Sequence, residues 1–241
     1  KYNLKQLNLS GDGSEPGASA TLHALSESST QPAHLISRLV MAVQKLGSFS
    51  IPIHELLGML QGLKLAEEYI VAIPSLSSLP DTLLLNVYLD SMCSASTLSP
   101  HKVHKSVAPR NLTTKIMRVS KAIVTTAPKI QIYFSHLQSS SLPADLNSKK
   151  MDNPLQISSS ELWRSGPIEY FRTTPPANWF LKVTCDSMDW QQPLADPKMA
   201  TSLYCSCNFS PDFCGADETH FYCPQCTTST FHCSDIFNHI E

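Results

Sequence analysis

The residues best suited to chemistry in this chain of 241 amino acids are cysteines gathered near its C-terminus. Six of the eight cysteines lie between residues 205 and 233, and three histidines, His220, His232 and His239, accompany them. Closely spaced thiolates with one or two imidazoles are the ligands that a tetrahedral Zn²⁺ site uses. The cluster therefore predicts structural zinc, with a disulfide framework in a secreted chain as the alternative interpretation.

The spacing within the cluster predicts how the metal is held. Cys223-Pro-Gln-Cys226 is a CxxC turn, which aims two sulfurs at one ion, and an upstream pair of thiols completes the tetrahedron. The predicted ligands are Cys205, Cys207, Cys214, Cys223 and Cys226. The donors left for a second site are His220, His232 and Cys233. Four protein ligands leave no open coordination position, so we expect the zinc to be structural rather than catalytic.

Composition narrows the class of protein. The formal net charge is −2 and only 16% of residues are charged, which argues against a strongly electrostatic nucleic-acid binder. No apolar run is long enough to cross a membrane. The chain begins at Lys1 and is rich in serine and proline, so we expect a piece of a larger protein. Of the compartments, the nucleus is favoured over the cytoplasm, and secretion is disfavoured.

One stretch of the chain is basic. Between Asp90 and Asp145 no acidic residue occurs, so the lysines and arginines there could follow a phosphate backbone or contact an acidic partner. The candidate contact residues are Lys102, Lys105, Lys115, Arg118 and Lys121. Because these cations are few and the chain from Asp186 onward is mostly acidic, we expect binding of nucleic acid to be weak.

Hydrophobic periodicity predicts the secondary structure. Apolar residues at helical spacing predict helices over 32–46 and 50–62, and another around 116–123. Alternating apolar residues predict strands over 129–134 and 179–185. Together they predict an α+β fold with a helical N-terminal lobe, a β-rich lobe and a C-terminal zinc ribbon. The expected parts are a flexible lead-in (1–30), a mainly helical lobe (31–126), a β-rich lobe with a Ser/Pro-rich loop (127–203) and a zinc-binding module (204–241).

The C-terminal quarter resembles a known family. A strand, a cysteine pair, an acidic hairpin and a CxxC turn are similar to the zinc ribbon inserted in the OB-fold of the replication protein A large subunit and its relatives. The residues that carry the resemblance are Cys207, Cys214, Cys223, Cys226 and Phe231, with 179–185 as the preceding strand. The resemblance implies an OB-like domain that contacts single-stranded nucleic acid.

Three functions compete on this reading. The first is a non-catalytic zinc-containing scaffold or adaptor of a larger nuclear protein, which mediates protein–protein assembly, with genome maintenance as one setting. The second is an OB-like binder of single-stranded nucleic acid. The third is a RING-like ubiquitin ligase module, which needs two zinc ions. The sequence contains no phosphate loop, GxSxG or HExxH motif, so it favours neither an enzyme nor a small-molecule substrate.

Overall fold

The structure, a computed structural model, divides into two compact units, Lys1–Pro193 and Leu194–Glu241. It describes residues 2–28, 35–47, 49–73, 82–99, 106–149, 154–191, 220–222 and 230–232. The larger unit contains a seven-stranded sheet in the order β3-β2-β1-β4-β5-β6-β7. The described part of the smaller unit is an antiparallel pair, β8 (His220–Tyr222) and β9 (Thr230–His232).

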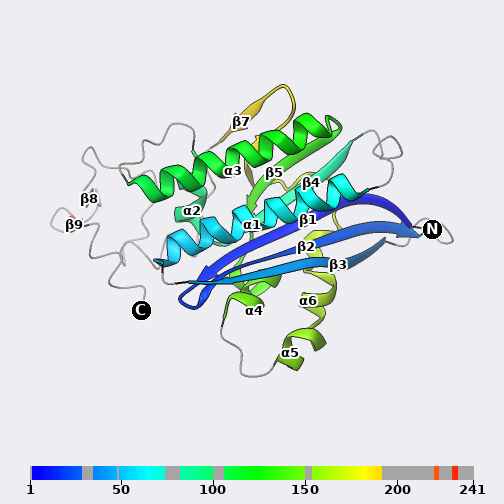
Figure 1. The fold of residues 1–241 in the computed structure, drawn as a ribbon, viewed down its shortest axis with the longest axis horizontal. Helices are drawn as coiled ribbons and strands as arrows, with labels where there is room; N and C mark the ends of the chain where they lie inside the picture. Colours follow the sequence, from blue (N-terminus) through cyan, green and yellow to red (C-terminus); the bar gives the residue numbers. More distant parts are fainter. Residues whose placement is uncertain are drawn as a thin grey trace. The chain divides into compact units, whose positions relative to one another are not determined.

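Three long strands open the chain as an antiparallel meander (Figure 1). They are β1 (Tyr2–Ser14), β2 (Gly17–Ser28) and β3 (Leu35–Leu46). The prediction of a flexible lead-in over residues 1–30 was therefore wrong, and so was the helix over residues 32–46. Nearly every residue of β3 pairs with β2, and this long-range pairing satisfies the backbone despite apolar spacing that also fits a helix.

The next elements build the parallel part of the sheet. They are α1 (Ile51–Ala72), β4 (Leu83–Leu89), α2 (Met92–Thr97), α3 (Val107–Thr126) and β5 (Ile130–His136). β4 pairs in parallel with β1, and β5 pairs in parallel with β4. Parallel neighbours require a crossover connection, and helices α1 and α3 provide one each.

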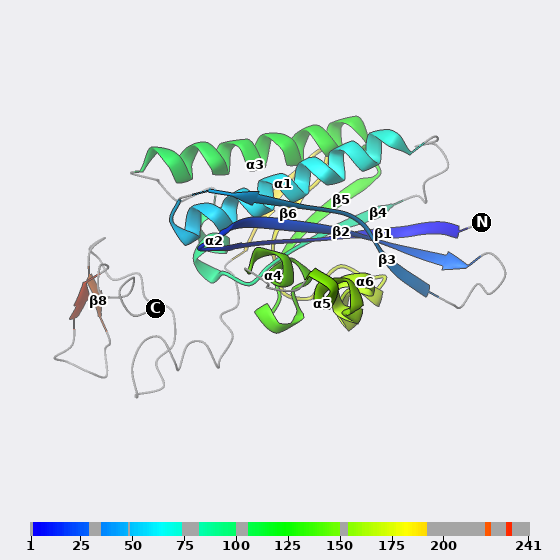
Figure 2. The same cartoon turned by 60° about the horizontal axis from the view of Figure 1, so that its bottom comes forward.

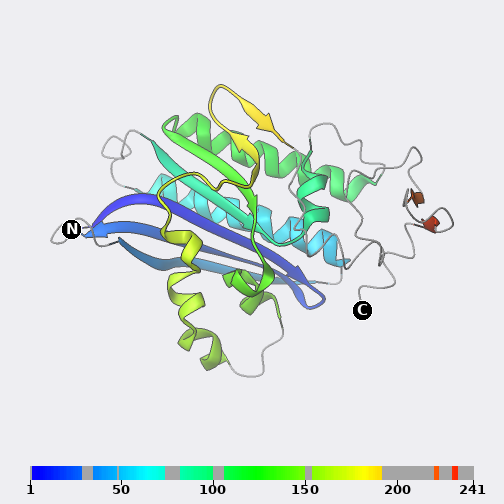
Figure 3. The same ribbon diagram turned by 180° about the vertical axis from the view of Figure 1, so that it is seen from behind.

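The chain then leaves the sheet and crosses its other face. This crossing segment, residues 137–178, contains η2 (Ser139–Ser141), α4 (Pro143–Ser148), α5 (Pro154–Ser159), α6 (Glu161–Ser165) and η3 (Ile168–Phe171). The sheet is then extended by the antiparallel strands β6 (Trp179–Val183) and β7 (Met188–Trp190). Figures 2 and 3 show α4, α5 and α6 on the face opposite α1 and α3.

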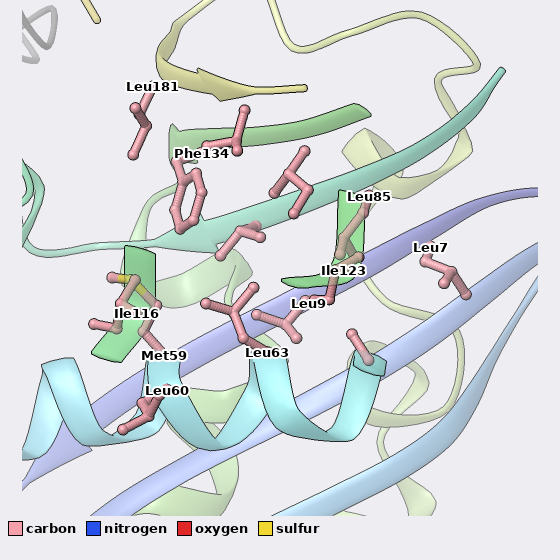
Figure 4. Packing of buried hydrophobic residues seen from close by; sticks show 14 of the residues in the cluster. Leu7, Leu9, Met59, Leu60, Leu63, Leu85, Ile116, Ile123, Phe134 and Leu181 are labelled. Atoms are coloured by element: carbon pink, nitrogen blue, oxygen red, sulfur yellow. The ribbon is translucent and has the colours of Figure 1, made fainter. Parts of the chain in front are cut away.

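The hydrophobic core lies between the sheet and helices α1 and α3 (Figure 4). Leu7 and Leu9 of β1 face α1, which contributes Leu63 to the same cluster. Ile116 and Ile123 are the contribution of α3. All five side chains are buried, so their apolar surface is withdrawn from water and stabilises this layer. The amphipathic helix predicted around residues 116–123 and the strands predicted over 129–134 and 179–185 are confirmed in position.

Helix α1 lies unusually close to β1, and glycine permits this. A Cβ atom added to Gly58 would lie 2.5 Å from the carbonyl oxygen of Asp12, and one added to Gly62 would lie 2.8 Å from Leu9. Gly62 is therefore a packing residue in the helix interior, and the helix continues to Ala72 instead of ending at the predicted position. The close approach also places the first turns of α1 beside the end of β1.

The α+β class is confirmed, but its predicted division into a helical and a β-rich lobe was wrong. Strands β5, β6 and β7 join the same sheet as the first four strands, so residues before and after 127 share one core. The zinc ribbon predicted over 204–241 lies mainly outside the described residues, and that boundary stays a prediction. None of the described helices combines the length and the apolar content that a bilayer span requires.

Candidate metal centre

Three carboxylates from distant parts of the sequence converge at one edge of the sheet. Asp12 lies near the end of β1, Asp90 directly follows β4, and Asp145 lies in α4. One ligand oxygen from each lies within 4.8 Å of the others. Strands β1 and β4 run in parallel, and Ser10 lies opposite Tyr88. Two residues further along each strand, Asp12 and Asp90 therefore lie at the same end of the pair, its carboxyl end.

The polar face of β1 and β2 holds the third carboxylate in place. Ser19 Oγ donates to the Ala144 carbonyl oxygen at 2.6 Å, and Ala144 N donates to Ser10 Oγ at 3.1 Å. These bonds anchor the residue that precedes Asp145. All of the groups involved are buried, so leaving one without its partner would carry a full desolvation penalty.

The same face fixes the rest of the crossing segment. Gln6 Nε2 and Asn8 Nδ2 both donate to the Tyr170 carbonyl oxygen, at 2.8 and 3.1 Å. His23 Nε2 donates to the Trp163 carbonyl oxygen at 2.9 Å. Alternate residues of β1 and β2 are therefore polar because they bind the backbone of a segment that lies much later in the sequence.

Serine hydroxyl groups contact the acidic side chains. Ser148 Oγ donates to Asp12 Oδ2, and Ser139 Oγ donates to Asp145 Oδ1 at 3.1 Å. A fourth carboxylate, that of Glu55 in α1, accepts a hydrogen bond from Ser94 Oγ. Hydroxyl donors of this kind orient each carboxylate and stabilise its ionised form.

Burial and mutual repulsion perturb these acids. Burial, followed by the negative charge of Asp90, raises the pKa of Asp12 from its ordinary 3.8 to about 7. Burial, with a contribution from Asp145, raises the pKa of Asp90. The pKa of Glu55 is also raised, mainly by burial and in part by Asp90. Carboxylates that are costly to ionise together are a strong attractant for a cation.

Two basic side chains border the cluster. Lys149 Nζ lies 2.6 Å from Asp145 Oδ2, one helical turn further along the chain. His136, at the end of β5, donates through Nε2 to the Asp90 carbonyl oxygen at 2.9 Å. The histidine bond ties the end of β5 to the residue that carries the second carboxylate.

The donor set fits a hard divalent cation. All the candidate ligand atoms are carboxylate oxygens, which Mg²⁺ prefers over thiolates and imidazoles. Mg²⁺ is commonly held by one or two protein carboxylates together with water and substrate phosphates. Asp12, Asp90 and Asp145 could therefore hold it, and Glu55 lies close enough to Asp90 for the charge of Asp90 to help raise the pKa of Glu55.

The predicted zinc ligands have a different outcome. Of these, Cys205, Cys207, Cys214, Cys223, Cys226 and Cys233 lie outside the described residues. His220 and His232 are opposite each other in the β8–β9 pair. Structural Zn²⁺ as the cofactor was a wrong prediction, since the metal-binding group found in the described residues consists of three aspartates suited to Mg²⁺. The zinc-ribbon resemblance itself is carried by residues outside the described ranges and stays a prediction.

The basic stretch is only partly described. Lys102 and Lys105 lie outside the described residues, whereas Lys115 and Arg118 are exposed on α3. Lys121 is also exposed, but its Nζ donates to the carbonyl oxygens of Thr184 and Cys185, at 3.2 and 2.6 Å. Lys121 therefore links α3 to the turn between β6 and β7, and Lys115 and Arg118 remain available to contact an anion.

Sequence reasoning missed the three aspartates as site residues. Asp90 and Asp145 were noticed only because they bound the stretch without acids, and Asp12 was assigned to a linker with the glycines beside it. The usable signal was an acidic residue directly after a fully buried strand, since strand ends commonly carry functional side chains. Nothing local to Asp145 reveals that α4 returns to the end of β1.

Among known proteins, similarity is found to solved structures. No family model matches the chain, and no curated protein matches it. The structure is similar to the N-terminal RNase H domain of Rv2228c from Mycobacterium tuberculosis, with 14% identity and a TM-score of 0.37, over 64% of this chain and 99% of that one. It is also similar to RNase H1 from Halobacterium salinarum, with 10% identity and a TM-score of 0.32, over 60% of this chain and 98% of that one.

A third similar structure is LC11-RNase H1 in complex with an RNA/DNA hybrid. It shares 10% identity at a TM-score of 0.30, over 55% of this chain and 84% of that one. These TM-scores are low, so the argument for function has to come from the site itself.

The prediction of a non-catalytic zinc scaffold was wrong. Among the described residues, the group that could hold a metal ion is a cluster of three carboxylates and not the cysteine site on which that prediction rested. The prediction that the protein belongs to the zinc-finger and scaffold classes was wrong for the same reason.

Proposed function

We propose that this protein is a Mg²⁺-dependent nuclease that hydrolyses phosphodiester bonds in nucleic acid. The observation that carries the proposal is the convergence of Asp12, Asp90 and Asp145 at the edge of the sheet, with their oxygens within 4.8 Å of one another. Clustered carboxylates that share divalent cations are the usual equipment of enzymes that transfer or hydrolyse phosphoryl groups.

The charge state of the cluster supports a role for a cation. Burial first, and then repulsion from a neighbouring carboxylate, raise the pKa values of Asp12 and Asp90, so ionising both groups without a cation is costly. If the cluster were purely structural, we would expect one of the acids to be replaced by a neutral residue, or all of their charges to be neutralised by neighbouring basic groups. An arrangement that keeps three acids together is better explained by a divalent cation that binds there in the working state.

The residues of the chain have separate tasks in this proposal. Asp12, Asp90 and Asp145 hold Mg²⁺, while Ser148 and Ser139 orient two of them. The bound cation would polarise the phosphate and lower the pKa of a water molecule. Burial at the sheet edge excludes bulk water from the inner side of the cluster, which strengthens each electrostatic interaction there.

Nucleic acid is the substrate class that the exposed cations of α3 favour. Lys115 and Arg118 are exposed on α3, and the sequence between Asp90 and Asp145 contains no acid that would repel a phosphate backbone. One of the similar structures is a complex with an RNA/DNA hybrid, so such a hybrid is included among the substrates to be tested. The predicted nuclear location and the predicted protein partners are untested and stay predictions.

The test is a cleavage assay on end-labelled oligonucleotides. The purified chain is incubated with single-stranded RNA, single-stranded DNA, duplex DNA and an RNA/DNA hybrid, in Mg²⁺ and in EDTA. We expect cleavage of at least one substrate in Mg²⁺, none in EDTA and none by Asp145→Asn in Mg²⁺.

The matched control is Asp189→Asn, because Asp189 is an exposed aspartate of β7 outside the cluster. That variant should cleave like the unmodified chain. Cleavage that persists in Asp145→Asn, or the failure of every substrate with Mg²⁺ shown to be bound, would rule the proposal out.

A further inference from the structure

Lys149 is the basic residue that touches the acidic cluster directly. Its ammonium nitrogen lies 2.6 Å from Asp145 Oδ2, and its side chain is 60% exposed while that of Asp145 is 15% exposed. The lysine therefore reaches the cluster from the solvent side, with its stem free to move. Two other ion pairs lie in the part of the chain that the structure describes, Lys5–Glu27 and Arg164–Glu161. Neither of them involves any of the three aspartates.

The ammonium group interacts with the cluster as a whole. The hydrogen bond to Asp145 raises the pKa of Lys149, and the charges of Asp145, Asp12 and Asp90 act in the same direction. A positive charge that is attracted by all three acids occupies the same region of negative potential that would attract a divalent cation. The two cations therefore compete for one electrostatic site.

Both oxygens of the Asp145 carboxylate already have a donor. Oδ1 accepts a hydrogen bond from Ser139, and Oδ2 accepts one from Lys149. While the ammonium group donates to Oδ2, a metal ion cannot approach that oxygen closely, because the two positive charges repel each other.

We propose that Lys149 is a resident counter-ion of the cluster, which a divalent cation displaces on binding and which thereby lowers the affinity for that cation. This proposal rests on the proposed function, since it assumes that the cluster binds a metal. The exchange involves no covalent change: the ammonium group leaves Asp145 Oδ2 for water, and the cation takes its place. Lys149 thus sets the affinity for the metal and is not itself a ligand.

The opposite role for Lys149 is to support metal binding by holding Asp145 in place. An Asp–Lys pair one helical turn apart on an exposed helix commonly contributes little, and Lys149 could merely hold Asp145 in its productive rotamer. In that case its removal would loosen a ligand and weaken metal binding. The two roles differ in the sign of one measurable quantity.

The test is a Mn²⁺ titration of the full chain, followed by electron paramagnetic resonance of the free ion. We expect Lys149→Met to bind Mn²⁺ about fivefold more tightly than the unmodified chain, the effect of removing one charge at close range in a well-hydrated site. Lys149→Arg keeps the charge and should stay close to the unmodified chain. Lys5→Met removes a lysine from a surface ion pair of similar length, 2.7 Å, and should leave the affinity unchanged.

Each outcome decides between the roles. Unchanged or weaker binding by Lys149→Met, with the folded state verified by circular dichroism, would overturn the proposal and leave the metal site standing. Absence of Mn²⁺ binding in the unmodified chain would instead remove the proposed function together with this inference. Should Lys149→Met fold poorly, Lys149→Gln provides the same loss of charge with a polar side chain.

Discussion

Ser148 Oγ donates a hydrogen bond to Asp12 Oδ2, although 136 positions separate the two residues in the sequence. Ser148 ends the short helix that carries Asp145, so this single bond joins the element of the third carboxylate to the strand of the first. The hydroxyl also contacts the Asp145 carbonyl oxygen, at 3.2 Å. Asp12 is buried, so the quality of its hydrogen bonding strongly affects its charge.

Replacement of this serine should weaken the metal site. We expect Ser148→Ala to raise the pKa of Asp12 further and to reduce Mn²⁺ affinity, because the ionised carboxylate loses a donor. The unfolding free energy should fall by roughly 1–3 kcal/mol. Denaturant unfolding and Mn²⁺ titration measure the two effects. The matched control is Ser165→Ala, whose hydroxyl donates to the exposed carboxylate of Glu161 and should matter little.

Stability should depend on pH in an uncommon direction for an aspartate. The pKa of Asp12 is raised in the folded state, so the folded chain binds its proton more tightly than the unfolded chain. The stability contributed by this proton is present below pH 4 and is lost as pH rises to about 7, by about 4 kcal/mol. Denaturant unfolding between pH 4 and 8 without divalent cations should show the loss.

Two variants isolate the origin of that pH dependence. Asp12→Asn removes the titrating group and should flatten the curve over the same range. Asp90→Asn removes the charge that, after burial, does most to raise the pKa of Asp12, so its curve should shift toward lower pH. A chain whose stability rises steadily from pH 4 to 7 would contradict the assignment.

The close packing of α1 on β1 should not tolerate an added methyl group. A Cβ on Gly58 would lie 2.5 Å from the Asp12 carbonyl oxygen, which is backbone and cannot move aside cheaply. We expect Gly58→Ala to cost about 1–3 kcal/mol or more. Gly47→Ala is the control, since its Cβ would meet ring carbons of Phe49 at 3.5 and 3.6 Å and His54 Nε2 at 3.7 Å, which are ordinary van der Waals distances. Equal melting temperatures for the two variants would show that α1 can shift freely.

The buried hydrogen bond from Ser19 of β2 to α4 should contribute more to the free energy of unfolding than an equivalent bond at the surface. Ser19→Ala leaves the buried Ala144 carbonyl oxygen without its donor, so we expect a loss of roughly 1–3 kcal/mol. Ser96→Ala removes the same type of bond, to the Cys93 carbonyl oxygen, in an exposed place and should cost much less. Hydrogen exchange of the crossing segment should quicken only in the first variant.

Local patterns were enough for elements whose faces differ in polarity. The amphipathic spacing of Ile116, Val119 and Ile123 predicted a helix correctly, because one face of α3 packs on the core and the other meets water. The strand β5 followed from alternation in the same way. A helix was also expected from residue 50, and α1 begins at Ile51.

Elements buried on both faces misled the sequence reading. In β1, Leu7 and Leu9 pack on α1, while Gln6, Asn8 and Ser10 are equally buried under the crossing segment. The polar residues of such a strand bind backbone groups that lie more than a hundred positions away in the sequence. Because the sequence does not show these partners, the polar residues make the strand resemble a linker. The same distance hid the site, since no local signal links Asp12 to Asp145.

The order in which the acids occur along the chain has a consequence for synthesis. A growing polypeptide displays Asp12 first and Asp90 next, but Asp145 and the serine that reaches back to β1 emerge only after five strands have been made. Under the proposed function, a nascent chain that has not been made past Ser148 lacks the serine that orients Asp12, so the complete cluster forms late in synthesis.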